Sequence, residues 1–241
     1  MASQTYVLPG DPVPTSLLPS STAPLRLGPG LRHVPRDTIT PTTAGELCVD
    51  HKKNAVWIDS NGGRYVPTQG DTILATVHHS STDFYSCAIT PHTAYALLPQ
   101  LAFEGATKKT RPQLVPGSLV YARISLANKH MDAELECVNP ATGKADGLGE
   151  LKDGMVFDIS VGMARRLMMP EPGTMGGLVV LEEVAEKIPF EVAVGRNGRI
   201  WVKSGLVAGT IAVGRAITQT DTEGLGVDEQ RKLVKKLLKA L

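Results

Sequence analysis

The fold of the C-terminal part of the chain is decided by residues 190–202, Phe190-Glu191-Val192-Ala193-Val194-Gly195-Arg196-Asn197-Gly198-Arg199-Ile200-Trp201-Val202. Two short runs of mainly apolar residues flank a central turn, and an Asn-Gly pair between such runs is typical of a tight β-hairpin. Gly195, Asn197 and Gly198 are fully explained by a turn that needs positive φ. We therefore predict a hairpin in which these three residues form a structural turn motif.

Further elements are expected on both sides of this hairpin. The apolar patterns predict a strand over residues 155–161 and helices over 162–169, 176–187, 206–219 and 228–241. Strands and helices mixed in this order indicate a compact α+β domain over residues 151–241.

Residues 63–150 have a different pattern, that of an all-β domain. Four strand candidates lie at residues 71–78, 83–89, 119–125 and 131–138. In the last one, apolar residues alternate strictly with Asp132, Glu134 and Glu136, which is the period of a half-buried strand. Four or five short strands in about 90 residues match the size of a small closed barrel such as the OB-fold.

Residues 1–62 are dominated by proline. Eight of the 17 prolines fall within the first 41 residues, and this density excludes long helices and interrupts β-ladders. We expect short strands and extended segments there, with clearer strand candidates at residues 45–50 and 54–59. Asn61-Gly62-Gly63 then provides a turn signal that closes this part of the chain.

Composition excludes several classes of protein. With 25 Lys+Arg against 24 Asp+Glu, a polyanion can be bound only through a local patch. The three cysteines lie far apart and form no Cys-x-x-Cys pair, so neither a zinc knuckle nor a disulfide framework is indicated. The N-terminus lacks the pattern of a secretory signal, and no apolar run reaches the length of a membrane span. These features lead us to expect a soluble intracellular chain that binds no membrane.

The local patch is predicted between Gly105 and Met131, where no acidic residue occurs. This stretch contains five basic residues, which are Lys108, Lys109, Arg111, Arg123 and Lys129. Three of them lie in Thr107-Lys108-Lys109-Thr110-Arg111-Pro112, which its proline marks as a loop. An isolated basic loop is usually only solvated, but OB-folds receive single strands at their loops. We therefore take Lys108, Lys109, Arg111 and Arg123 as candidate RNA-binding residues.

Other polar groups point to no catalytic or metal chemistry. Asp132, Glu134 and Glu136 are spaced about 7 Å apart on a strand, too far for a tight metal cluster. The basic stripe of the last helix, Arg231, Lys235 and Lys239, is more simply a solvated face. No phosphate-binding loop, dinucleotide fingerprint or hydrolase motif is present. We expect no catalytic residue, metal or cofactor.

Taken together, the segments resemble the cap subunits of the RNA exosome that contain an S1-type barrel and a KH domain. The resemblance rests on residues 6–11, 27–31, 70–71, 108–112, 117–123, 149–155 and 190–202 and covers essentially the whole chain. It implies three domains: an N-terminal Pro-rich β domain at 1–62 that docks on partner subunits, an S1-type OB barrel at 63–150 and a KH-type domain at 151–241. A sibling cap subunit with the same domain order is the main alternative within the family.

The resemblance implies a non-catalytic role in 3′→5′ RNA processing and degradation, including rRNA maturation. Cap subunits sit on a ring of RNase PH-like subunits beside the other cap subunits, and guide single-stranded RNA to associated exoribonucleases in the nucleus, nucleolus and cytoplasm. The charged barrel loop faces the central channel in that family, which corresponds to Lys108, Lys109 and Arg111 here.

An RNA-binding KH domain clamps RNA with a Gly-x-x-Gly loop between two helices. The corresponding connection, residues 171–177, contains this spacing once, as Gly173-Thr174-Met175-Gly176, and the sequence does not decide whether it contacts RNA. We expect that the Gly195–Gly198 turn packs against the barrel and sets the angle between the two domains.

Two other functions remain open on the residues alone. The chain could be a freestanding S1/KH RNA-binding adaptor in translation or ribosome assembly, which co-purification with a ring of related subunits would exclude. It could also be a phosphorolytic ribonuclease, although the two modules leave too little chain for a catalytic core.

Overall fold

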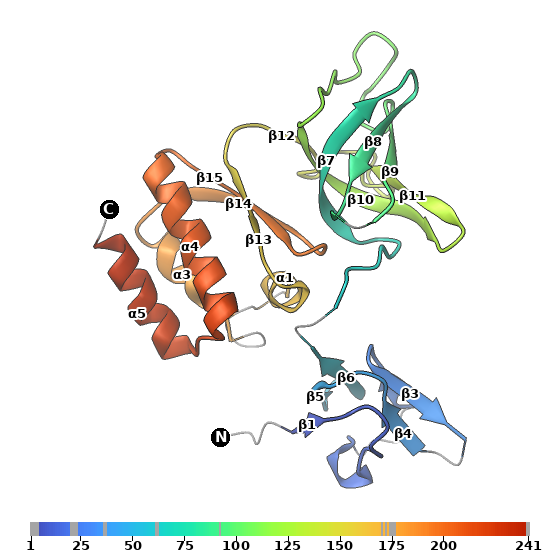
Figure 1. Cartoon of the computed structure of the whole chain (residues 1–241), viewed down its shortest axis with the longest axis vertical. Helices are drawn as coiled ribbons and strands as arrows, with labels where there is room; N and C mark the ends of the chain where they lie inside the picture. The colour runs from blue at the N-terminus through green and yellow to red at the C-terminus, as the bar shows by residue number, and fades with distance from the viewer. Residues whose placement is uncertain are drawn as a thin grey trace. The chain divides into compact units, whose positions relative to one another are not determined.

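The computed structural model describes residues 5–19, 24–35, 38–60, 63–91, 93–169, 171, 173 and 177–239. The chain forms two compact units, Met1–Gly63 and Arg64–Leu241, which are described separately (Figure 1). Asn61 and Gly62 of the predicted turn lie outside the described residues.

The first unit is built from short strands, as its prolines predict. Its four-stranded sheet has the order β1-β5-β6-β2, and a separate two-stranded ladder joins β3 and β4. The bounds are β1 (Tyr6–Val7), β2 (Arg26–Leu27), β3 (Leu31–Val34), β4 (Thr38–Pro41), β5 (Gly45–Asp50) and β6 (Ala55–Asp59), with one 3₁₀ turn at Thr15–Leu17. Val56 and Ile58 are fully buried in its small core.

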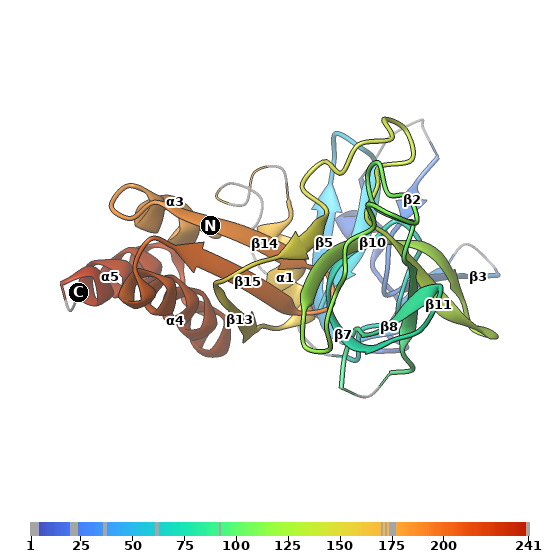
Figure 2. The ribbon, with the colours of Figure 1, turned by 90° about the horizontal axis from the view of Figure 1, so that it is seen from above.

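A closed barrel forms the first part of the second unit. Its strands are β7 (Thr72–Ser80), β8 (Phe84–Ala88), β9 (Ala96–Pro99), β10 (Leu119–Asn128) and β11 (Met131–Glu136), with β12 (Gly149–Leu151) added beside β10. Strand β11 pairs in parallel with β9 and antiparallel with β10, which closes the ring of strands seen in Figure 2. The predicted OB-type barrel is therefore confirmed.

Alternating side chains fill the barrel. Leu135 and Cys137 are buried, as the period-two pattern predicts, while Met131 on the same face is exposed because it lies at the β10–β11 turn. Burial raises the pKa of Cys87 and of Cys137 to about 12.

The remainder of the unit is an α+β domain of the predicted kind. A sheet of order β13-β15-β14 carries its helices on one face (Figure 1). The bounds are β13 (Met155–Asp158), α1 (Val161–Leu167), α3 (Val180–Ala185), β14 (Phe190–Gly195), β15 (Arg199–Ser204), α4 (Val207–Glu223) and α5 (Val227–Leu238). Ile200 and Val202 of β15 point into the helical core, and Trp201 between them packs on the opposite face. None of the helices described is long and apolar enough to cross a bilayer.

Several predicted boundaries were wrong, among them the end of the helix expected over 206–219, which runs to Glu223 as α4, and side-chain hydrogen bonds explain two others. The strand at 155–161 ends at Asp158 because Ser160 caps α1: its Oγ accepts a hydrogen bond from the Met163 amide at 3.0 Å. The helix expected over 176–187 appears as α3, which begins only at Val180. Gln230 holds the preceding segment as a loop, since its Oε1 accepts from the Val179 amide at 2.9 Å and its Nε2 donates to the Gly177 carbonyl at 2.8 Å.

Candidate nucleic-acid interface

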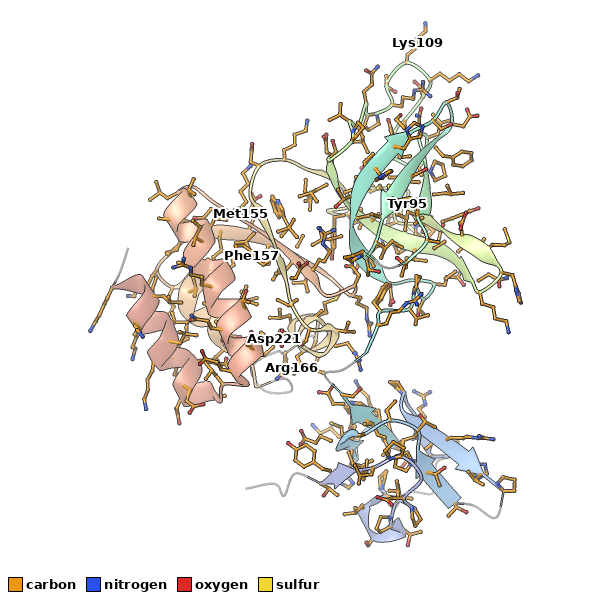
Figure 3. The ribbon with its side chains drawn as sticks, in the orientation of Figure 1. Tyr95, Lys109, Met155, Phe157, Arg166 and Asp221 are labelled. Atoms are coloured by element: carbon orange, nitrogen blue, oxygen red, sulfur yellow. The ribbon has the colours of Figure 1, made fainter. Side chains whose placement is uncertain are left out.

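The loop between β9 and β10 holds two lysines at its outer end. A tight turn over Thr107–Thr110 is closed by hydrogen bonds from the Thr110 and Arg111 amides to the Thr107 carbonyl, at 3.1 and 2.9 Å. The hydroxyls of Thr107 and Thr110 also lie 2.8 Å apart. Lys108 and Lys109 are therefore exposed on an ordered turn, and Figure 3 places Lys109 at the far end of the loop.

The base of this loop is anchored to the barrel by Tyr85. Its buried ring belongs to the barrel core, and its hydroxyl donates to the Pro112 carbonyl at 2.6 Å and accepts from the Leu114 amide at 3.2 Å. Arg111 adds a second attachment, because its guanidinium donates to the Thr82 carbonyl at 3.2 Å. These contacts fix the direction in which the lysines project.

Arg123 lies apart from this loop, in the middle of β10. Its Nε donates to Glu136 Oε1 of β11 at 2.8 Å, and the two side chains form an ion pair. This carboxylate neutralises the guanidinium, so the attraction of Arg123 for a phosphate is weaker than that of Lys108 and Lys109. Its role in RNA binding stays a prediction.

The same ion pair involves one of the three acidic residues of β11, Asp132, Glu134 and Glu136. Glu136 is engaged by Arg123, and no group of three potential metal ligands occurs among the residues that the structure describes.

Two aromatic side chains on the barrel surface were not singled out from the sequence. Phe84 of β8 is 40% exposed beside Pro99, its partner in β9. Tyr95 is 45% exposed and stacks on His78, with ring centroids 4.6 Å apart. The alternation of buried Tyr85 and Cys87 could have identified Phe84 as outward-facing, whereas the Tyr95–His78 pair joins residues distant in the sequence and leaves no local signal.

Asn197 of the turn motif is buried against the barrel. Its Nδ2 donates to the carbonyls of Leu74 and Ile89 at 2.8 and 2.7 Å, and its Oδ1 accepts from the Leu74 amide at 3.2 Å. Only 6% of its surface is exposed. The side-chain amide of Asn197 is therefore engaged by the barrel and is not free to contact RNA.

The two glycines of the motif allow this close approach. A Cβ on Gly195 would lie 2.7 Å from the Leu74 amide nitrogen, and one on Gly198 would lie 2.7 Å from the Ile159 carbonyl oxygen. Gly198 also has a φ of +77°, which favours glycine. Larger residues at either position would push the hairpin away from its neighbours.

Charged and aromatic contacts surround the turn. Arg196 forms an ion pair with Asp71 at 3.5 Å, and the Tyr65 hydroxyl donates to the same carboxylate at 2.9 Å. Burial, with the negative charge of Asp71, raises the pKa of Tyr65 well above its usual value. Arg199 donates to Thr76 Oγ1 of β7 at 3.0 Å. The barrel and the α+β domain are thus joined by polar contacts on both sides of Asn197.

Family profiles match the chain in three consecutive segments. Residues 25–64 match the Rrp40 N-terminal domain of an exosome complex exonuclease, residues 65–149 the S1 domain of exosome complex component RRP40, and residues 154–208 a KH domain. These segments correspond in order to the Pro-rich strands, the barrel and the α+β domain.

Curated relatives match over nearly the whole length. Exosome complex component rrp40 of Schizosaccharomyces pombe is 40% identical over 98% of this chain and 96% of its own length. RRP40 of Drosophila melanogaster is 38% identical over 92% of each. A crystal structure described as an exosome complex RNA-binding protein has the same fold over 73% of this chain and 97% of its own, with a TM-score of 0.57 at 22% identity.

Proposed function

This chain belongs to the RRP40 family of exosome complex components, and we propose that it is a non-catalytic, RNA-binding cap subunit of an exosome. In this role it guides single-stranded RNA toward a 3′→5′ exoribonuclease held elsewhere in the assembly. The proposal is carried by the ordered loop that presents Lys108 and Lys109 in an otherwise nearly neutral protein.

The chemistry of the loop suits guiding better than tight binding. Two exposed lysines can neutralise about two phosphates, and each such contact weakens as salt displaces it. Because a lysine is a flexible point charge that reads no base, RNA of any sequence can slide past. Phe84 and the Tyr95–His78 pair offer faces on which passing bases can stack.

The KH-type domain has a supporting role in this proposal. Its Gly195–Gly198 turn is engaged by the barrel through Asn197, so it is unavailable to clamp a phosphate backbone. We infer that this domain and the barrel act as one rigid body, which keeps the basic loop at a constant position. Arg123 is assigned a minor part in RNA contact because Glu136 neutralises it.

Partners and location follow from the same family membership. We propose that the N-terminal unit docks on RNase PH-like ring subunits beside other cap subunits, and that exoribonucleases associate with the assembly. Nuclear, nucleolar and cytoplasmic pools are expected, with rRNA maturation and RNA turnover as the processes served.

The test is RNA protection and decay by a reconstituted exosome that contains this chain with Lys108→Glu and Lys109→Glu. Arg111 is kept because it holds the loop on Thr82. The matched control is Lys232→Glu with Lys236→Glu, an equal charge change on the exposed side of α5.

We expect the loop variant alone to shorten the protected RNA and slow its decay, with unchanged assembly. Equal protection and decay by the wild type and the loop variant would contradict the guiding role. Failure of the tagged chain to recover ring subunits from extract through a salt wash would contradict the cap assignment itself.

A further inference from the structure

A second surface feature, distant in sequence from the basic loop, lies where the segment that follows α3 meets the last turn of α5. A groove of about 460 Å³ is lined there by Lys187, Ile188, Lys235, Leu238 and Lys239. Ile188 and Leu238 are half-buried and continue the helical core, so they form an apolar floor. The three lysines are exposed around it.

The lysines of this groove have no ion-pair partner in the part of the chain that the structure describes. None of the groove's described lining residues is acidic. Arg231, one turn earlier on α5, differs, since it pairs with Glu183 at 2.9 Å. Lysines near the C-terminus of a helix stabilise it by interacting with the helix dipole. That interaction alone does not explain why the lysines come from two segments and surround an apolar floor.

The residues that line the groove favour an acidic peptide over RNA as its anionic partner. RNA would be held by phosphate contacts and by stacking of its bases on aromatic rings, and none of the described residues that line the groove is aromatic. An aliphatic floor with a cationic rim instead complements a peptide in which an apolar side chain is flanked by carboxylates.

We propose that this groove, Lys187, Ile188, Lys235, Leu238 and Lys239, is a docking site for an acidic segment of another protein, anchored by one aliphatic or aromatic side chain. The site is separate from the proposed RNA path and does not depend on the cap assignment. Its apolar contact provides most of the affinity, while its lysines give selectivity and an association that weakens with salt.

The experiment is selection from a displayed library of 12-residue peptides, each with six Asp/Glu around two randomised apolar positions, against the full-length chain. Selected peptides are then synthesised and their affinities measured at low and high salt. Two variants are compared, Lys235→Glu with Lys239→Glu in the groove, and Lys232→Glu with Lys236→Glu on the same helix outside it. A fluorescent single-stranded oligouridylate is titrated against the same proteins.

We expect selected peptides whose affinity falls at least about tenfold with the groove variant, since two attractions become repulsions, and changes little with the control variant. Three results would overturn the proposal: no enriched peptide, equal loss with both variants, or loss of oligouridylate binding with the groove variant alone. The last result would identify a nucleic-acid site.

Discussion

At the scale of single residues, Asn197 connects two domains through its side chain. The three backbone groups that it contacts belong to Leu74 and Ile89, more than 100 positions away in the sequence. A buried amide with three good partners stabilises both sides of a contact, and its loss leaves all three partners unpaired. The Asn-Gly pair explains the shape of the hairpin turn. Other residues could form the same turn, but only asparagine makes the hydrogen bonds to Leu74 and Ile89.

Replacing Asn197 with alanine tests this connection. We expect Asn197→Ala to lower the free energy of unfolding by about 2–4 kcal/mol, because buried backbone groups lose their partners. Urea unfolding measures the change, with Asn128→Ala as the control because Asn128 is exposed and makes one local bond to the His130 amide. A variant with unchanged stability that no longer crosslinks to RNA would contradict the structural role of the turn.

The buried cysteines give a second prediction at this scale. Because burial raises the pKa of Cys87 and Cys137 to about 12, both remain protonated and unreactive at pH 8. Since their pKa in the unfolded chain is near 9, the stability that they contribute is present below pH 9 and is lost as pH rises toward 12. Alkylation at pH 8 followed by mass spectrometry should leave both unmodified until denaturant is added. Rapid labelling of both thiols in the folded protein would contradict their burial.

At the scale of elements, the loop between β9 and β10 owes its order to Tyr85 of β8. The tyrosine hydroxyl bonds two backbone groups of the loop, at Pro112 and Leu114, while its ring belongs to the barrel core. The loop is therefore positioned by a residue that lies 27 and 29 positions before the two groups it bonds. Proline and glycine in the sequence predict a loop, but only this contact determines the direction in which its lysines project.

The substitution Tyr85→Phe tests the anchoring of the loop without changing the charge of the loop. We expect the variant to lose about 1–2 kcal/mol of unfolding free energy and to exchange the Leu114 amide faster with solvent. RNA protection by the reconstituted exosome should fall, although Lys108 and Lys109 are retained. Hydrogen exchange with mass spectrometry reports the first change, and unchanged exchange in this loop would contradict the anchoring role.

At the scale of the whole molecule, the barrel and the α+β domain share a small core of their own. Leu74 of the barrel packs with Ala193 and Trp201 of the sheet, and the Tyr121 hydroxyl donates to the Val194 carbonyl at 3.1 Å. The indole of Trp201 donates to the Asp153 carbonyl at 2.8 Å. One face of the hairpin thus completes the helical core and the other face requires the barrel.

Fragments of the chain test this dependence. Trp57 and Trp201 are the two tryptophans, so fluorescence of fragment 64–241 reports Trp201 alone. We expect the Trp201 emission of this fragment to be blue-shifted, as for a buried indole. The emission should change in a single unfolding transition. Fragment 151–241 should emit at longer wavelength and unfold at a lower temperature, because it exposes the face that contacts the barrel. Identical emission and stability in the two fragments would contradict the shared core.

Much of the architecture was predictable because it is encoded locally. Period-two runs, the Asn-Gly turn and the proline density identified the strands, the hairpin and the lack of long helices in the first unit, since each depends on neighbouring residues. The end of β13 and the start of α3 were missed where capping by Ser160 and bonding by Gln230 override the apolar pattern. The basic loop was likewise visible as a stretch without acidic residues.

The sequence by itself thus determined the order of the domains, the kind of each fold and the location of the free basic charge. The tertiary structure alone decided which of these charges remain available, because Glu136 reaches Arg123 from the neighbouring strand, while Lys108 and Lys109 form no ion pair with any of the described residues. It also decided the partners of Asn197 and the groove between residues 187–188 and the end of α5. These properties depend on distances between residues far apart along the chain, and such distances exist only after the chain has folded.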